Sequence, residues 1–572
     1  QTVELKGWVA KKRNLGALVF IDLRDRYGIT QIIINEEMEN ISKDIKNEYI
    51  LYVKGTVVER SSKNPNMPTG DIEVDASEIK IINTANTTPI IVADDTDALE
   101  ETRMQYRYLD LRRPVMQNKI LTRHKITRSI REYLDSHDFV DIETPYLNRS
   151  TPEGARDFLV PSRVHHGDFY ALPQSPQLFK QLLMVAGFEK YYQIARCFRD
   201  EDLRADRQPE FTQVDVEMSF MTTDEIIEVG ENMVAKVIKD VKGVDVKLPL
   251  PRMTWHEAME TYGIDKPDIR FDMKLVNLNE VVKDVDFMVF KSALENNGYV
   301  KGINVKNHAS DYSRKKIDQL TELAKTYKAK GLAWLKVNNG VGEGPIAKFF
   351  SEEQMQRLIE AMNGEDNDLL LFVSDTKYMV VCDALAALRN HLGKELTLYD
   401  SKELGLLWVV DFPMFEYDDE TQRYYAMHHP FTMPFEEDLE FIDERPVDFL
   451  SNAYDIVLNG TEIGGGSVRI RQDDIQEMMF KALGFTMERA YDQFGFLLNA
   501  FKYGVPPHAG LAYGLDRLVM LMAQEDSIRD VIAFPKVKDA SCLMSEAPNT
   551  VDAKQLEELG ISIVKPEAET EE

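Results

Sequence analysis

The spacing of apolar residues changes along the chain, and this change constrains the fold more than any other feature of the sequence. In the first part of the chain apolar and polar residues alternate, which is the pattern of half-buried strands. Turn-forming residues at 14–16, 27–28 and 68–70 separate five such runs, and a polar stretch at 36–47 fits a short helix. Five strands with this interruption predict an OB barrel over residues 1–85, with a generic small β-domain as the alternative.

After a polar linker at 86–105, apolar residues recur at helical spacing. Residues 118–137 predict an amphipathic helix, which runs into a strand that Pro145 closes. Because no regular βαβ pattern orders the later elements, we expect an antiparallel sheet flanked by helices over residues 106–271 and 404–545, within an α+β multidomain chain. The strands predicted later in this sheet are 191–197, 212–220, 408–412 and 465–470.

The pattern between residues 272 and 403 differs from both of its neighbours. Helical spacing at three places surrounds a glycine-rich segment at 338–344. We interpret 272–403 as an inserted α+β domain whose role the sequence does not predict. Residues 546–572 form a C-terminal extension with an acidic tail, which is typical of a solvated segment. The three predicted helices of the insertion are 315–330, 352–362 and 384–392.

Composition narrows the class of protein. The net charge of −29 argues against a nucleic-acid partner only on average, because residues 101–132 hold 9 Lys/Arg against 3 Asp/Glu and phosphate binding depends on local potential. The 3 cysteines are far apart, which suits a reducing cytosol and offers no zinc-ligand spacing. The apolar stretches fall far short of the ~20 residues of a membrane span, and no leader is visible. We therefore expect a cytoplasmic protein without zinc or a membrane segment.

Four arginines crowd a loop between two predicted strands. They are followed by Phe211, which opens the second strand. Guanidinium groups offer several fixed donors to phosphate, and an aromatic face gives adenine a surface to stack on. The hairpin therefore predicts a triphosphate site, with a salt-bridged hairpin as the alternative. The arginines are Arg196, Arg199, Arg204 and Arg207.

Two further segments suit the same site. Glycines at 510 and 514 lead into an apolar helix that contains Arg517, and a buried arginine needs an anionic partner. Asp455 and Glu462 flank a turn at Asn459 and Gly460. Paired carboxylates beside a triphosphate are oxygen ligands for Mg²⁺, so these two residues are the predicted metal ligands.

Taken in order, these segments resemble the class II aminoacyl-tRNA synthetases, and within them the bacterial-type aspartyl subgroup. The class signatures are the helix and strand that end at Pro145, the sequence Phe198-Arg199-Asp200-Glu201, and Gly514-Leu515-Asp516-Arg517. The subgroup is indicated by segments 174–181 and 427–432 and by the inserted domain. The resemblance covers essentially the whole chain.

The resemblance implies a homodimeric enzyme that activates L-aspartate with ATP and Mg²⁺, releases pyrophosphate and transfers aspartate to the 3′ end of tRNA(Asp). Neither step needs a protein nucleophile, so catalysis would come from positioning and electrostatics. Catalytic roles are implied for Arg199, Glu201 and Arg517. The implied ATP-binding residues are Arg199, Asp200, Glu201, Arg207, Gln208, Phe211, Glu462, Gly514, Leu515, Asp516 and Arg517.

Aspartate would be recognised by its charge. Lys180 and Arg469 would neutralise its side-chain carboxylate, which asparagine lacks, although Lys180 could instead be a solvated helix lysine. The loop at 150–157 is suited to close over substrate. The aspartate-binding residues implied by the resemblance are Glu153, Ser175, Gln177, Lys180, Arg199, Asp215, His428 and Arg469.

In the barrel, the resemblance assigns anticodon recognition to Arg13, Phe20 and Gln31. Unpaired bases stack on aromatic rings and are read along their edges, which suits this set. Phe20 could instead face the core, because its neighbours Val19 and Ile21 are also apolar. Leu15 stands where relatives of broad tRNA specificity often carry histidine, and this favours strict specificity for tRNA(Asp).

Three other readings remain. An asparaginyl relative would generally lack the inserted domain. An RNA-binding paralogue without catalysis would be expected to lose Arg199, Glu462 or Arg517, and all three are present. An ATP-dependent amidating enzyme on the same catalytic fold would not need the barrel.

Overall fold

The computed structural model describes residues 1–16, 18–151, 155–418, 420–441 and 449–564. The chain forms two units. The first contains residues 1–124, 203–208 and 529–551, and the second contains residues 125–202, 209–528 and the segment from 552 onward. Within the described residues, we find no helix with the length and apolar character of a membrane span.

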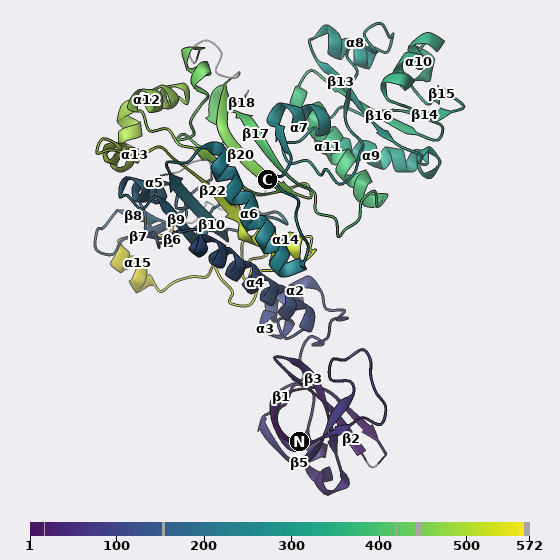
Figure 1. The fold of residues 1–572 in the computed structure, drawn as a ribbon, viewed down its shortest axis with the longest axis vertical. Coiled ribbons are helices and arrows are strands. Elements are labelled where there is room, and N and C mark those ends of the chain that lie inside the picture. The colour runs from purple at the N-terminus through teal and green to yellow at the C-terminus, as the bar shows by residue number, and fades with distance from the viewer. Residues whose placement is uncertain (17, 152–154, 419, 442–448, 565–572) are drawn as a thin grey trace. The chain divides into compact units, whose positions relative to one another are not determined.

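The first unit begins with a closed five-stranded barrel, as the alternating pattern predicts (Figure 1). The strands follow one another around the barrel in the order β1-β2-β3-β5-β4, and only the β3–β5 pair among them is parallel. Alternation places one face of each strand in the core, for example Val9, Ile21 and Val53. The elements are β1 (Thr2–Leu15), β2 (Leu18–Asp25), β3 (Gly28–Ile34), η1 (Glu36–Met38), α1 (Glu39–Asp44), β4 (Ile50–Glu59), β5 (Ile72–Asn83), α2 (Glu100–Gln105) and α3 (Arg107–Asp110).

An eight-stranded sheet forms the centre of the second unit, in the order β11-β17-β20-β21-β22-β10-β9-β6. Neighbouring strands from β17 to β9 are antiparallel, as predicted, whereas the short edge strands β6 and β11 pair in parallel. The strand expected to end at Pro145 is reduced to two residues, because proline has no amide to donate to a ladder. The strands are β6 (Val140–Asp141), β9 (Lys190–Phe198), β10 (Glu210–Ser219), β11 (Arg252–Thr254), β17 (Leu406–Pro413), β20 (Leu450–Leu458), β21 (Thr461–Val468) and β22 (His508–Gly514).

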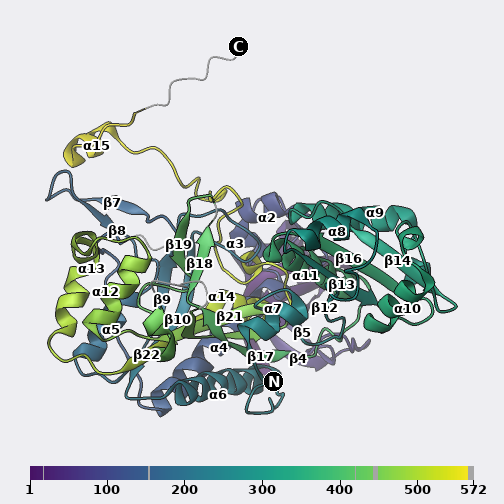
Figure 2. The same cartoon turned by 90° about the horizontal axis from the view of Figure 1, so that it is seen from above.

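Helices cover this sheet on both faces. The predicted amphipathic helix is α4 (Pro114–Ser136), and its Ser129 bonds Asp240 of α6 at 2.7 Å. Gly230 of α6 lies against Leu511 and Tyr513 of β22, while the residues between them on β22 face the opposite side. On that opposite side lie α5 and α14 (Figures 1 and 2). The helices are α5 (Gln177–Val185), α6 (Thr223–Lys242), α7 (Trp255–Tyr262), α12 (Asp473–Ala482), α13 (Met487–Phe501), α14 (Leu515–Met522) and α15 (Ala553–Leu559).

A second sheet, of five strands, forms the insertion. Helices α9 and α11 pack on one of its faces and α8 and α10 on the other, so an apolar layer lies on each side of the sheet (Figure 1). The predicted glycine-rich segment is the hairpin between β14 and β15. The elements are β12 (Val276–Asn277), α8 (Met288–Glu295), β13 (Tyr299–Val305), α9 (Arg314–Thr326), β14 (Ala333–Asn338), β15 (Val341–Glu343), α10 (Glu352–Ala361), β16 (Leu369–Asp375) and α11 (Tyr378–Glu395).

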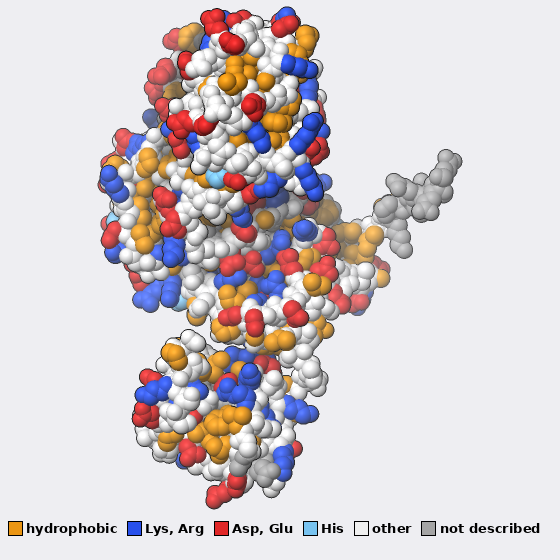
Figure 3. Space-filling view, turned by 90° about the vertical axis from the view of Figure 1, so that its right-hand side faces the viewer, with side chains coloured by type: hydrophobic (Ala, Val, Ile, Leu, Met, Phe, Trp, Pro, Cys, Tyr) orange, Lys and Arg blue, Asp and Glu red, His pale blue; other side chains and the backbone are white. Residues whose placement is uncertain are grey.

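Charged side chains of both signs lie on the surface, whereas the three cysteines are buried. Acidic and basic side chains are interspersed on the face seen in Figure 3, so the net charge of −29 does not form a single acidic surface there. Cys197, Cys382 and Cys542 are buried free thiols.

Two small two-stranded sheets also belong to the second unit. They pair β7 (Leu159–Pro161) with β8 (Phe169–Ala171) and β18 (Phe415–Asp418) with β19 (Arg423–Ala426).

Candidate active site

Two cations and two carboxylates meet on the α5 side of the large sheet, and we call them the charge cluster. Asp215 and Glu217 are two residues apart on β10, so their side chains leave the same face of the strand. Lys180 of α5 places its Nζ 2.6 Å from Oδ1 of Asp215 and 3.4 Å from Oε2 of Glu217. Arg469, directly after β21, donates through Nε and Nη2 to the two oxygens of Glu217 at 3.0 and 3.1 Å. All four residues are at most 2% exposed, so the cluster is almost closed to water.

The charges of the cluster compensate one another. Burial alone raises the pKa of Glu217, but Arg469 and Lys180 outweigh it and hold that pKa below its usual value. Burial raises the pKa of Asp215 and outweighs the opposing effect of Lys180. The Oδ2 atom of Asp215 is buried and has no hydrogen-bond partner among the described residues. A buried acceptor of this kind is suited to a donor on a ligand.

Sequence reasoning missed two residues of this site, Glu217 and His429. Nη1 of Arg469 lies 2.6 Å from Nε2 of His429. Burial and the nearby Arg469 hold the pKa of His429 well below its usual value, so the neutral ring accepts this bond. Glu217 could have been found from the alternation along β10, because it faces the same side as Asp215. No signal in the sequence separates the role of His429 from that of its neighbour His428.

The arginine hairpin brings a cation and an aromatic ring together. It joins β9 to β10, where Phe211 pairs with Cys197 across the ladder. The guanidinium carbon of Arg199 lies 4.9 Å from the centroid of the Phe211 ring, which is a cation–π distance. The Nε of Arg199 is buried without a partner in the described part of the chain. This pair has the groups that the sequence predicts for a triphosphate site.

The two predicted metal ligands lie on neighbouring strands. Asp455 is on β20 and Glu462 on β21, and Nε2 of His428 lies 3.4 Å from Oδ1 of Asp455. Burial and the charge of Asp455 raise the pKa of Glu462, while Arg517 lowers it. Arg517 of α14 also donates to the backbone oxygen of Glu462 at 3.3 Å. A carboxylate whose pKa is raised by a second carboxylate marks excess negative charge, which a divalent cation would neutralise.

Several residues predicted to bind ATP also have partners inside the protein, and their contact with ATP stays a prediction. Oδ2 of Asp516 accepts a bond from the backbone N of Thr212 at 2.7 Å, and Leu515 is a core residue. The side-chain amide of Gln208 exchanges two bonds, at 3.0 and 2.7 Å, with the backbone of Lys536 inside the first unit. The remaining members of the set lie in the loop after β9 and at the end of β22: Asp200, Glu201, Arg207 and Gly514.

The other predicted aspartate contacts are spread along two segments. Ser175 and Gln177 precede or begin α5 and line a pocket beside it. His428 is the partner of Asp455 described above. Glu153 lies outside the described residues, so the predicted closing loop at 150–157 is seen only at its two ends, where Oγ of Ser150 donates to Asp157 at 2.9 Å.

In the barrel, the side chains of the three residues predicted for RNA recognition leave the strands on the side away from the core, where Arg13 and Phe20 are partly exposed and Gln31 is buried. Phe20 stands opposite Arg13 and Ile33 in the ladders, whereas its neighbour Ile21 fills the core, so Phe20 points outward. Nη2 of Arg13 donates to Oε1 of Gln31 at 3.0 Å. Two residues that sequence reasoning missed also hold Gln31: Arg60 donates to Oε1 at 2.9 Å, and Glu73 accepts from Nε2.

Comparison with protein families identifies both parts of the chain. Residues 99–538 match the model described as tRNA synthetases class II (D, K and N), and residues 3–82 match the OB-fold nucleic acid binding domain. The aspartate–tRNA(Asp/Asn) ligase of Bacillus mycoides is 60% identical over 98% of this chain and 96% of its own length. The ligase of the same name from Bacillus cytotoxicus is 59% identical over the same shares.

Solved structures agree on the fold. An asparaginyl-tRNA synthetase of Entamoeba histolytica, in complex with asparaginyl-adenylate, has a TM-score of 0.59 at 20% identity and covers 94% of this chain and 95% of its own. A putative aspartyl-tRNA synthetase of Leishmania major has a TM-score of 0.57 at 19% identity and covers 94% of this chain and 90% of its own.

Proposed function

The chain belongs to the class II tRNA synthetases of the D, K and N group, and on that basis we propose that it is an ATP-dependent aspartate–tRNA ligase. It activates L-aspartate to aspartyl-adenylate with release of pyrophosphate and then transfers the aspartyl group to the 3′ end of tRNA. The observation that carries the choice of amino acid is the charge cluster, which holds two cations in a nearly dry site.

Aspartate would bind to the cluster through both of its charged ends. A guanidinium has five N–H donors, and the bonds of Arg469 inside the protein use four of them. The fifth, together with a donor of Lys180, would meet the side-chain carboxylate. The unpartnered Oδ2 of Asp215 would accept from the α-ammonium group. Asparagine would offer these donors a neutral amide in place of an anion, so it would lose the charge-assisted hydrogen bonds that a carboxylate makes.

Both steps of the reaction require the protein to orient the reactants and to stabilise charge at fixed positions. The α-carboxylate of aspartate attacks the α-phosphate and pyrophosphate leaves; a terminal ribose hydroxyl of the RNA then attacks the carbonyl and AMP leaves. Arg199 would neutralise the α-phosphate, and Phe211 and Arg517 would hold the adenine. Asp455 and Glu462 fit Mg²⁺, which when bound neutralises phosphate charge.

A further part of the proposal is that the outer face of the barrel reads the anticodon. Gln31 is buried there and holds Arg13 in place, while Phe20 offers a ring for stacking. A second candidate specificity is supported by the relatives at about 60% identity, whose names include both tRNA(Asp) and tRNA(Asn). Leu15, exposed near the β1–β2 turn, favours tRNA(Asp) alone. Charging of tRNA(Asp) and tRNA(Asn) transcripts with labelled aspartate decides between them.

The proposed function is tested by pyrophosphate exchange with each of the twenty amino acids. We expect exchange with aspartate and close to background with asparagine. Exchange with asparagine alone, or with no amino acid at all, would contradict the proposal.

A further inference from the structure

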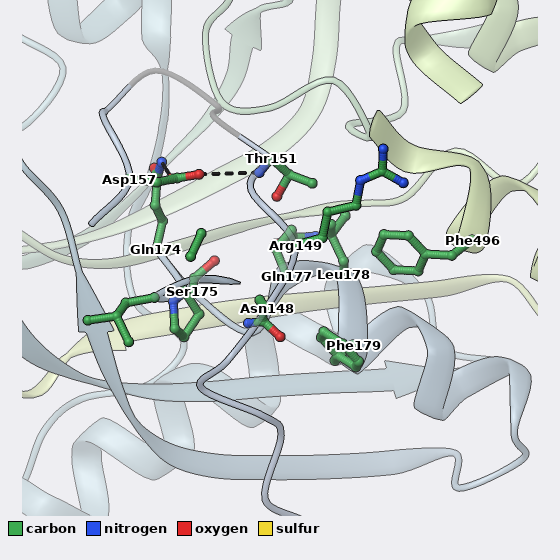
Figure 4. A pocket seen from close by; sticks show the side chains of 13 residues that line it. Asn148, Arg149, Thr151, Asp157, Gln174, Ser175, Gln177, Leu178, Phe179 and Phe496 are labelled. Atoms are coloured by element: carbon green, nitrogen blue, oxygen red, sulfur yellow. Dashed lines mark hydrogen bonds between the residues drawn. The ribbon is translucent and has the colours of Figure 1, made fainter. Parts of the chain in front are cut away.

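A pocket lies between α12 and α13, two helices that pack side by side in the second unit (Figures 1 and 2). Its volume is about 280 Å³. Within the described residues, it shares no lining residue with the pocket beside α5 that Figure 4 shows, and it contains none of the residues proposed above for ATP, aspartate or RNA. The lining residues are Asp473, Gln476 and Glu477 of α12 and Met487, Tyr491 and Leu498 of α13.

The two walls of this pocket differ in their chemistry. The three residues of α12 are spaced three and four positions apart, so two carboxylates and an amide leave the same face of the helix. On α13, Leu498 is 4% exposed and Met487 packs against the same core, while Tyr491 adds an aromatic ring. Oxygen acceptors on one wall and an apolar surface on the other suit a ligand with one charged and one apolar part.

The side chain of Gln476 points to the kind of group that this ligand must carry. Gln476 is 4% exposed, and its amide nitrogen donates to the backbone oxygen of Pro430 at 2.9 Å. Because a carbonyl oxygen can only accept, the other polar atom of this amide must be the oxygen. That atom, Oε1, is buried and has no partner among the described residues, although buried acceptors are nearly always bonded. An N–H donor on a ligand would satisfy it.

The charges beside Gln476 favour a cationic donor. Asp473 and Glu477 are exposed, and neither has an ion-pair or hydrogen-bond partner in the part of the chain that the structure describes. Lys502 lies nearby, with its Nζ 5.1 Å from the centroid of the Tyr491 ring, but it donates to Asn499. A metal ion fits poorly, because the described residues contain no group of three or more His, Cys, Asp or Glu side chains that could hold one. An organic cation fits both walls.

We propose that this pocket binds a short aliphatic diamine. One ammonium group, which has three N–H donors, would bond Oε1 of Gln476 and one carboxylate of α12, while the carbon chain lies against Met487 and Leu498. Asp473 and Glu477 are one helical turn apart, about 6 Å along the axis. The second ammonium group, at the far end of a four-carbon chain, therefore meets the other carboxylate. The site goes beyond the proposed function, because it requires neither ATP nor RNA.

The test is calorimetric titration of the full chain with 1,4-diaminobutane, at low ionic strength because salt screens exposed charges. We expect one saturable site per chain. Glu477→Gln and Asp473→Asn should each weaken binding about tenfold, since each removes a hydrogen bond to a charged group. Gln476→Met keeps the length of the side chain and removes its oxygen, so it should weaken binding as well. The thermal midpoint of this variant is measured in parallel, because the bond to Pro430 is also lost.

Asp474→Asn is the matched control, because Asp474 is an exposed acid of the same helix that lies outside the lining. It should change the affinity by less than about twofold, as exposed charges contribute little. Butane-1,4-diol has the same carbon chain without charge and should not bind, and n-butylamine should bind more weakly than the diamine. The proposal is overturned if no saturable site appears, if Asp474→Asn weakens binding as much as Glu477→Gln, or if the diol or the monoamine binds as tightly as the diamine.

Discussion

Glu217 determines how two cations can share one buried site. Both oxygens of its carboxylate accept hydrogen bonds from Arg469, and Oε2 lies 3.4 Å from Nζ of Lys180. The same Nζ also pairs with Oδ1 of Asp215. Removing one partner from a buried ion pair leaves a charge without compensation, which typically costs about 3–5 kcal/mol. Each member of the cluster should therefore affect stability and, under the proposed function, the choice of amino acid.

The first prediction separates these two effects. Arg469→Leu should lower the thermal midpoint, because Glu217 keeps only Lys180, and should reduce aspartate activation by roughly two orders of magnitude. Adding Glu217→Leu should restore much of the stability but not the activation, because the buried charges are then removed together. Thermal unfolding and aspartate-dependent pyrophosphate exchange are measured on both variants, with ATP affinity by calorimetry as the control. Normal activation in either variant would remove Arg469 from the aspartate pocket.

The second prediction concerns the close approach of backbone to this cluster. A Cβ on Gly510 would stand 1.9 Å from Oε2 of Glu217 and 2.3 Å from the backbone oxygen of Val216, so Gly510→Ala must displace β22 or the carboxylate. We expect loss of aspartate activation and a lower thermal midpoint. Gly495→Ala is the control, since its nearest neighbour would be 3.7 Å away and alanine favours the helix. Equal behaviour of the two variants would show that the space at Gly510 is not required.

At the scale of strands and helices, the barrel is expected to contribute to RNA binding and not to aspartate activation. Phe20 lies outside the barrel core, and the predicted ATP and aspartate contacts all follow in later segments of the chain. Phe20→Ala should therefore weaken tRNA binding by about 1–3 kcal/mol while aspartate-dependent pyrophosphate exchange and the thermal midpoint stay nearly unchanged. tRNA charging at low RNA concentration and exchange are compared, with Ile21→Ala as a core control that should lower the midpoint. A parallel loss of charging and exchange in Phe20→Ala would count against an RNA role.

Elements with long periodic patterns were predictable, and pairings between distant segments were not. The spacing over 118–137 predicts α4 because apolar residues repeat along its own turns, whereas the extent of β6 depends on its pairing with the distant strand β9. Phe20 has apolar neighbours on both sides, so only the register with β3 decides its direction. Glu217 and Arg469 are 252 positions apart, and no local pattern relates them.

In the whole molecule, most residues proposed for activation belong to the second unit and those proposed for RNA recognition to the first, although Arg207 and Gln208 of the proposed ATP set belong to the first unit. The charge cluster, Arg199 and Phe211 belong to the second unit, and Arg13, Phe20 and Gln31 to the first. Because the barrel and the large sheet have separate hydrophobic cores, aspartate activation and anticodon recognition should respond independently to substitutions. Pyrophosphate exchange measured without tRNA therefore tests the residues proposed for aspartate activation and not those proposed for anticodon recognition.

The last prediction is that two chains associate. Apolar side chains remain exposed on α4, β6 and the β7–β8 sheet, namely Leu121, Val140, Leu159 and Phe169. Such surfaces are typical of an interface, and C2 pairing is the commonest arrangement of identical chains. Sedimentation at micromolar concentration should report twice 65.7 kDa. Val140→Glu should shift the equilibrium toward monomer because a carboxylate would be buried, whereas Val341→Glu, at an exposed valine of the insertion, should not. A fully active monomer at that concentration would contradict the prediction.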